Sequence, residues 1–299
     1  MIIDAHFHSW QLARNDYGWL TPAMGRIYRD VDVSHWLHEA HACGVQAGVL
    51  VQAAPTEAET LHLLRLADAH PQVLGVVGWA DFLAADALQR IRALARHRKL
   101  RALRPMLQDI AQADWIVQSA VQPCLALMAE LGLVLDALVK PVHLPHILAV
   151  AKAHPGLSIV IDHGAKPDIA AGLVAAGELC ADTPALNPAG QAWRTWSEAM
   201  GQLAACPNVV CKLSGLLTEA GPAPAPHAAR PWAQQVLHTF GTQRVLWGSD
   251  WPVLELASHY ADWWHECQAL VGPDAAAQSA IFGGNAQRVY GLQMGPIAP

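Results

Sequence analysis

Eight short apolar segments, each separated from the next by a helix-like stretch, are the feature that most constrains the fold of this chain. They span residues 2–6, 47–51, 73–79, 100–106, 133–138, 157–162, 209–213 and 244–248. Continuous apolar runs of this length are typical of parallel strands buried on both faces. Alternation with helices predicts a parallel sheet, and the count of eight favours a closed (β/α)8 TIM barrel. An open dinucleotide-binding sheet is disfavoured because no G-x-G-x-x-G follows the first segment.

Helix start and stop signals support this division. Ser34 is expected to open one helix and Gly44 to close it, and residues 56–59 form a Thr-x-x-Glu capping-box pattern. Pro123 and Pro145 stand where a first helical turn tolerates proline. Three dipeptides just before expected strands contain a proline that would stop the preceding helix; they are His70-Pro71, His154-Pro155 and Cys206-Pro207.

Length and composition predict one domain over residues 1–299, since barrels of this size are common and no linker is evident. Two stretches, residues 181–190 and 221–231, are expected to be loops over the C-terminal mouth of the barrel. A net charge of −6 without a basic block argues against nucleic acid or an anionic membrane as partner. No run of eighteen apolar residues predicts a membrane span. The chain shows no signal peptide and no C-x-x-C pair, so a cytoplasmic protein is expected; the oligomeric state is left open.

Polar residues gather where three of the expected strands end. His6 and His8 are two apart in the first strand, so their imidazoles should project together. Asp250 follows the eighth apolar segment, where it is either a site residue or a helix cap. Asp162 and His163 follow the sixth, and one of the two is expected to face inward.

Two cations lie in expected buried strands, Arg104 in the fourth and Lys212 in the seventh. A buried cation needs a negative partner, so each is either part of a site or part of a structural ion pair. Together with the imidazoles and Asp250 they would suit water activation: Asp250 would take a proton from water, and histidines, Arg104 or Lys212 would hold a carbonyl oxygen.

Several of the 12 tryptophans fall at or near expected strand ends. Aromatic faces there suit a flat or sugar-like ligand, and plain packing is the alternative for each. These residues are Trp10, Trp19, Trp79, Trp115 and Trp251.

Three motifs carry a family resemblance: residues 3–8 (IDAHFH), residues 161–167 (IDHGAKP) and residues 247–252 (WGSDWP). They resemble the amidohydrolase superfamily, and more narrowly its sugar-lactonase branch of the L-fuconolactonase and L-rhamnonolactonase type. Further matching pieces are residues 16–20, 51–53, 77–79, 104–109, 212–215 and 284–286. The likeness extends from residue 3 to about residue 292 and implies a (β/α)8 barrel that hydrolyses a small sugar-acid lactone.

The resemblance also implies residue roles. It casts Asp250 as the base that activates water and places His6, His8 and His163 around the substrate carbonyl or a metal, with Arg104 as a further catalytic group. The expected substrate-binding residues are Gln52, Trp79, Lys212, Trp251 and Tyr28.

The sequence departs from the two-metal members of the superfamily at the positions of their metal ligands. Two-metal members use lysine or glutamate in the fourth strand as a bridging ligand, whereas Arg104 cannot ligate. The fifth strand offers Asp136 and Lys140 in place of a terminal histidine, and His143 comes later. One Zn²⁺ held by His6, His8, His163 and Asp250 is chemically acceptable. We favour catalysis without a required cofactor, because a lactone is an activated ester.

Two other functions are compatible with the same residues. Zinc-dependent decarboxylases of the superfamily share an H-x-H motif and an Asp after the eighth strand, but they need a tightly held metal. A non-catalytic ligand-binding barrel would bind a sugar lactone without turning it over.

Overall fold

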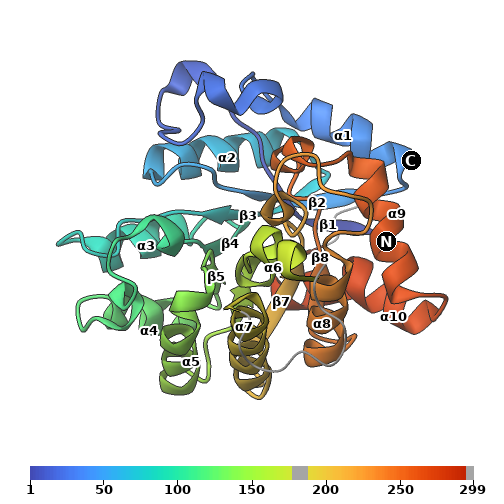
Figure 1. Cartoon of the computed structure of the whole chain (residues 1–299). Coiled ribbons are helices and arrows are strands. Elements are labelled where there is room, and N and C mark those ends of the chain that lie inside the picture. The colour runs from blue at the N-terminus through green and yellow to red at the C-terminus, as the bar shows by residue number, and fades with distance from the viewer. Residues whose placement is uncertain (177–187, 294–299) are drawn as a thin grey trace.

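A computed structural model describes residues 1–176 and 188–293 of the chain. Its eight parallel strands follow one another around a nearly closed barrel in the order of the sequence (Figure 1). The strands are β1 (Ile3–Phe7), β2 (Ala47–Val51), β3 (Val73–Gly78), β4 (Leu100–Leu103), β5 (Val134–Ala137), β6 (Ile159–Ile161), β7 (Val209–Leu213) and β8 (Val245–Trp247). The predicted (β/α)8 barrel is confirmed.

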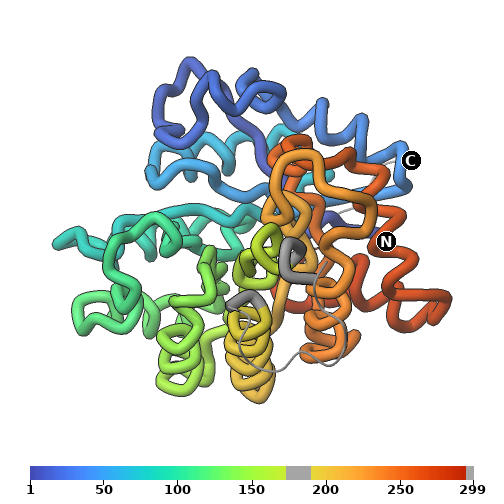
Figure 2. The backbone as a smooth tube through the Cα atoms, in the orientation of Figure 1, coloured from blue at the N-terminus to red at the C-terminus, as the bar shows by residue number. Residues whose placement is uncertain are grey.

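Helices lie between the strands, and the backbone winds around the sheet in one direction from the N-terminal to the C-terminal colours (Figure 2). The helices are α1 (Val33–Ala42), α2 (Glu57–Ala69), α3 (Ala87–Leu94), α4 (Gln122–Glu130), α5 (Leu144–Ala153), α6 (Ile169–Ala176), α7 (Pro188–Ala204), α8 (Arg230–Phe240), α9 (Tyr260–Val271), α10 (Ala275–Ser279) and α11 (Asn285–Val289). In the described part of the chain, no helix is both long and apolar enough to cross a membrane.

The barrel is joined between its first and last strands just beyond the end of β8. The amide of Asp250 donates to the carbonyl of His6 at 2.8 Å, and the amide of His8 donates to the carbonyl of Trp251 at 2.8 Å. A parallel bridge pairs Phe7 with Trp251. The closure therefore passes through the residues that carry the predicted site.

Two apolar clusters fill the structure. One lies inside the barrel, where side chains such as Ala5, Val49 and Leu246 alternate along the strands, with Tyr290 and Leu292 in the same cluster. The other, much larger, lies between the strands and the surrounding helices. This double burial explains why the strands read as unbroken apolar runs.

The helix boundaries correct the sequence predictions in detail. Asp32, not Ser34, caps α1: its carboxylate accepts from the amides of Ser34 and His35. Thr56 caps α2 as predicted, but Glu59 does not return to the amide of Thr56. Its carboxylate instead accepts from the amides of Ala53 and Ala54, because the chain after β2 bends toward it.

The two predicted mouth loops have different outcomes. Residues 221–229 connect β7 with α8 as a loop, and Pro231 is in the first turn of α8. Residues 181–187 lie outside the described part of the chain, and residues 188–190 are helical rather than loop because α7 begins at Pro188.

Candidate active site

Four polar side chains meet at the C-terminal end of the barrel: His6, His8, His163 and Asp250. Oδ1 of Asp250 lies 3.5 Å from Nε2 of His6, 3.3 Å from Nε2 of His8 and 3.8 Å from Nε2 of His163. Nε2 of His6 is 3.2 Å from Nε2 of His8. His6 is fully buried, while His8, His163 and Asp250 are 4%, 2% and 4% exposed. The structure thus brings together the four residues proposed from the sequence as base and possible metal ligands.

A local irregularity in β1 turns both histidines of the H-x-H motif to the site. The pairing of β1 with β2 shifts register between Asp4 and Phe7. Phe7 stacks on Trp36 of α1 at a centroid distance of 3.8 Å, and Asp4 accepts from the indole of Trp36. These contacts point Asp4 and Phe7 outward, while His6 and His8 face the mouth. In a regular strand Asp4 and His6, two residues apart, would point the same way; the register shift between Asp4 and Phe7 separates their directions.

Asp4 fastens this end of β1 to the segment after β8. Its carboxylate accepts from the amide of Ser249 at 2.8 Å, from the hydroxyl of Ser249 at 2.6 Å and from the hydroxyl of Tyr260 at 2.9 Å. At Gly248, a Cβ atom would meet Cβ of His6 at 2.8 Å. A glycine is therefore required there for His6 to fit beside the strand.

Asp162 and His163 both face the site, which corrects the prediction that only one of them would do so. His163 leaves the extended conformation, with φ at +55°, and begins a left-handed turn. Strand alternation therefore ends at Asp162. Oδ1 of Asp162 lies 3.6 Å from Nδ1 of His6, and His163 reaches Asp250 from the same turn.

His163 is held from the side of β7. Its Nδ1 atom is 2.9 Å from the hydroxyl of Ser214. The next residue, Gly215, has φ at +62°, and a Cβ atom there would overlap the imidazole of His163. The Ser214-Gly215 pair thus supplies both a partner for the ring and the room it occupies.

Lys212 lies beneath the histidines and is fully buried. Its Nζ atom is 2.5 Å from Oδ2 of Asp136, 3.0 Å from Oδ1 of Asp162 and 3.1 Å from Nδ1 of His6. An ammonium group has no lone pair and can only donate; here it hydrogen-bonds to Asp136 and His6 and forms an ion pair with Asp162. Nδ1 of His6 consequently accepts, and its proton is on Nε2.

Arg104 is also part of this floor. Its guanidinium donates to Oδ2 of Asp162 at 3.1 Å and to Oε1 and the carbonyl of Gln52. Gln52 returns a hydrogen bond to the carbonyl of Arg104. Arg104 is 3% exposed and Gln52 is fully buried, so the arrangement favours the structural ion pair over a cation that faces substrate.

The charges of the site follow from burial and from these contacts. Burial, together with the charge of Lys212, holds the pKa of His6 well below its ordinary value, and burial lowers the pKa of His163 to about 4. Burial alone would raise the pKa of Asp250. The charges of His163 and His6 and the hydrogen bond with His8 outweigh burial and hold that pKa well below its usual range. At neutral pH, Asp250 is thus a carboxylate and His6 and His163 are neutral.

The expected aromatic contacts are mostly packing contacts. Trp251 is 2% exposed and donates to Glu255, and Trp10 is buried against Trp19. Trp79 is half-buried at the end of β3, while Tyr28 is 38% exposed. Within the described residues, no hydrogen bond links the side chain of Tyr28 or Trp79 to the four-residue cluster.

The donor set can be tested against one divalent cation. His8 donates from Nδ1 to the carbonyl of Val51 at 2.8 Å, which leaves its Nε2 facing Oδ1 of Asp250. If His8 is neutral, both atoms are acceptors, and a positive centre between them, either a proton or a metal ion, removes their repulsion. Within the described residues, two sets of three donors lie close enough together to hold one metal ion, and both contain His6: His6, His8 and Asp250, and His6, Asp162 and His163. Imidazole and carboxylate groups are ordinary ligands of zinc. His6 fits less well, because Lys212 places the proton of His6 on the atom that would have to ligate.

Several residues that hold the site side chains in place were not assigned a role from the sequence. Asp136 and Tyr290 are examples: the hydroxyl of Tyr290 donates to Asp136 at 2.9 Å. A charged residue inside an apolar strand was the available signal for Asp136, because such a residue requires a buried partner. Ser214 and Ser249 gave no such signal.

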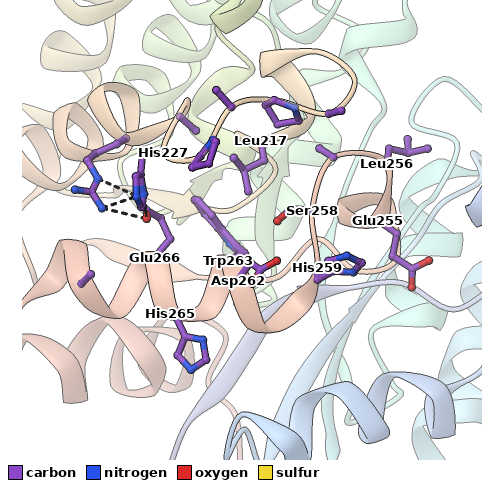
Figure 3. A pocket seen from close by; sticks show the side chains of 18 of the residues that line it. Leu217, His227, Glu255, Leu256, Ser258, His259, Asp262, Trp263, His265 and Glu266 are labelled. Atoms are coloured by element: carbon purple, nitrogen blue, oxygen red, sulfur yellow. Dashed lines mark hydrogen bonds and ion pairs between the residues drawn. The ribbon is translucent and has the colours of Figure 1, made fainter.

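A separate cavity of about 790 Å³ lies between the chain after β7, the chain after β8 and helix α9 (Figure 3). Leu217, Glu255 and Trp263 line it. His227 and Arg230 bond to Glu266 at its edge. None of the four converging residues lines this cavity, so it does not contain the cluster.

The fold and this constellation define an amidohydrolase, and the sequence comparison agrees: the profile of the Amidohydrolase family matches residues 3–292, so the chain belongs to that family. The chain is 44% identical over 295 residues to an L-fucono-1,5-lactonase of Burkholderia ambifaria, covering 96% of this chain and 94% of that protein. It is 36% identical to an L-fucono-1,5-lactonase of Burkholderia multivorans, covering 97% of this chain and 96% of that protein.

The same family appears among solved structures. A crystal structure of an amidohydrolase from Burkholderia multivorans with bound zinc superposes with a TM-score of 0.87 at 33% identity, covering 98% of this chain and all of that one. A second crystal form of an amidohydrolase from that organism, with bound HEPES, gives a TM-score of 0.88 at 33% identity over the same shares of the two chains.

Proposed function

We propose that this protein hydrolyses L-fucono-1,5-lactone to the free sugar acid, with Asp250 as the base that activates water. The sugar-lactone hydrolase class rests on the two lactonase relatives, which match the chain over nearly its whole length. The observation that carries the mechanism is the single carboxylate of Asp250 set among three imidazoles at the barrel mouth.

In this proposal, Asp250 removes a proton from water, and the resulting hydroxide adds to the lactone carbonyl carbon. A low pKa keeps Asp250 ionised and able to accept that proton throughout the neutral range. The tetrahedral intermediate then collapses by breaking the bond between carbonyl carbon and ring oxygen. Protonated Asp250 returns its proton to the ring oxygen, which leaves as a hydroxyl group, so Asp250 serves as base and then as acid.

His163 is the proposed donor to the carbonyl oxygen. Its neutral imidazole can carry the proton on Nε2 if the hydroxyl of Ser214 donates to Nδ1, and Nε2 faces the mouth beside Asp250. A donor in that position stabilises the negative charge of the tetrahedral intermediate. Ser214 is then a positioning residue, and Lys212 has the corresponding role for His6.

We also propose that a metal ion is not required, since a lactone is more reactive than an amide and the neutral imidazoles offer hydrogen-bond donors. His6, His8 and Asp250 are the residues that would hold a divalent ion. Such an ion would supply Lewis acidity at the carbonyl oxygen or lower the pKa of a bound water. The cytoplasm is the proposed location, in line with the free thiols of the five described cysteines.

The test is acid release from fresh L-fucono-1,5-lactone and a panel of other aldonolactones, followed with a pH indicator. We expect turnover by the wild type and a loss of roughly 10²–10⁴-fold in kcat for Asp250→Asn. Asp262→Asn, an exposed carboxylate on α9, is the matched control and should keep wild-type rates. Absence of turnover with every lactone would reject the proposal and favour the zinc-dependent decarboxylase instead.

A further inference from the structure

The turn that follows β6 has a conformation that few side chains adopt. Four successive residues, 163 to 166, have positive φ values of 55°, 57°, 65° and 47°. Only Gly164 adopts such angles without strain. Strain of this kind occurs mainly where function requires it and the surroundings impose it.

Neighbouring groups hold this left-handed turn in place. The indole of Trp196 donates to the carbonyl of Gly164 at 2.8 Å, and the amide of Lys166 donates to the carbonyl of His163 at 2.9 Å. At its start the turn presents His163 to Asp250. At its end it presents Lys166, whose side chain none of the reaction steps above uses.

Lys166 faces a carboxylate that the mechanism also leaves unused. Its Nζ atom lies 3.7 Å from Oε1 of Glu219, which belongs to the short turn Thr218–Ala220 after β7. That separation exceeds the 2.7–2.9 Å usual for a charge-assisted hydrogen bond. The two side chains are 21% and 26% exposed, so both charged ends are partly withdrawn from water without being fully satisfied by each other.

Glu219 lies within electrostatic reach of the reaction centre. Burial raises its pKa; the charge of Lys166 opposes that effect, and the negative charge of Asp250 adds to it. Both members of the pair come from chain segments that follow strand ends, β6 and β7, on the same face as Asp250. The pair is thus placed where the parts of a substrate distant from its carbonyl would extend.

We infer that Lys166 and Glu219 bind ring hydroxyls of the lactone and so determine which sugar series the enzyme accepts. This inference rests on the proposed lactonase function. A hydroxyl group is both a donor and an acceptor, so one placed between the pair donates to the carboxylate of Glu219 and accepts from Lys166. A lactone that lacks this hydroxyl, or carries it on the other face, leaves two partly buried charges unsatisfied and is rejected.

The experiment compares two lactones that differ in a single hydroxyl, the preferred substrate and its deoxy or epimeric analogue. Glu219→Gln and Lys166→Gln are expected to lower kcat/KM for the preferred lactone by about 10- to 100-fold, mainly through KM, while changing the analogue much less. Glu57→Gln is the matched control and should change neither: Glu57 lies on α2, forms an ion pair with Arg90 of α3, and is about as exposed as Glu219.

A purely structural link between the two loops predicts a different result. Both lactones would then lose rate by the same factor in both variants, and that outcome would overturn the inference. A second measurement distinguishes an error in this inference from an error in the proposed lactonase function. It monitors binding of the aldonic acid product through tryptophan fluorescence. If the wild type hydrolyses no lactone but binds the acid, weaker binding by the two variants supports the inference, and unchanged or absent binding rejects it.

Discussion

Nζ of Lys212 lies 3.1 Å from Nδ1 of His6, so a fully buried ammonium group fixes the proton of a site imidazole from below. The same ammonium donates to Asp136 and forms an ion pair with Asp162. The tautomer of His6 and the stability of the barrel floor therefore depend on one side chain. Removing that side chain should affect both together.

Lys212→Met is expected to destabilise the protein by about 3 kcal/mol or more, because it leaves Asp136 buried without a cation and Asp162 with Arg104 alone. Thermal unfolding measures the change. Asp136→Asn in the same chain should restore part of the lost stability, since it removes the carboxylate that has lost its cation. A single variant as stable as the wild type would show that Lys212 does not neutralise these carboxylates.

Gly215→Ala should damage catalysis more than folding. The added methyl group would overlap His163 and displace it from Ser214, so we expect kcat/KM to fall by about 100-fold, in the range of a lost oxyanion donor. Gly241→Ala is the control: its φ of +67° imposes a similar backbone strain, but nothing lies within 4 Å of the new atom. If the two variants have equal activity, His163 does not depend on the space at Gly215.

Glu59 should make stability depend on pH. Burial raises its pKa from 4.5 to about 7, against the hydrogen bonds from Ala54 and Ala53. The folded state then holds this proton more tightly than the unfolded state, so the free energy of unfolding falls as pH rises from about 4.5 through about 7. The shift corresponds to roughly 3 kcal/mol.

Comparing the wild type with Glu59→Gln in chemical denaturation from pH 5 to pH 8 checks this prediction. The glutamine variant should be less sensitive to pH over that range. Parallel curves for the two proteins would mean that the three backbone contacts from Ala53 and Ala54 keep Glu59 ionised in spite of its burial.

Removal of metal should leave lactone hydrolysis largely intact. The wild type, dialysed against a strong chelator and checked for zinc by atomic emission, is expected to keep most of its kcat. Loss of activity that returns with Zn²⁺ would contradict this expectation and make His6, His8 and Asp250 ligands of a required ion. His8→Ala would then also lower the zinc content of the protein as isolated.

The sequence predicted the architecture well because its signals are local. The bounds of β2 and β7 agree with their apolar runs, and the other strands are shorter by one to three residues or displaced by one. At Arg104 the predicted strand continued to residue 106, whereas β4 ends at Leu103, since Arg104 turns to Gln52 and Asp162 and Pro105 has no amide hydrogen to donate.

The convergence of four polar side chains at the barrel mouth was predicted from the sequence, but the residues that lie beneath them were not. Residue type and position at strand ends placed His6, His8, His163 and Asp250 together. That Lys212 and Arg104 lie beneath them depends on contacts with Asp136 and Asp162 across the barrel, which no local pattern records. The left-handed turn after β6 was equally invisible, because Ala165 and Lys166 are ordinary residues whose positive φ is imposed by their surroundings.

The hydrogen bond from the amide of Asp250 to the carbonyl of His6 joins the start of the chain to a residue about fifty positions from its end. During synthesis, the imidazoles emerge from the ribosome long before the carboxylate that they surround. With Asp250 as the proposed base, the nascent chain would be inert until the segment after β8 docks against β1. On this proposal, hydrolysis requires the completed ring of strands, and a chain that ends before residue 250 would have no activity however well its earlier part folds.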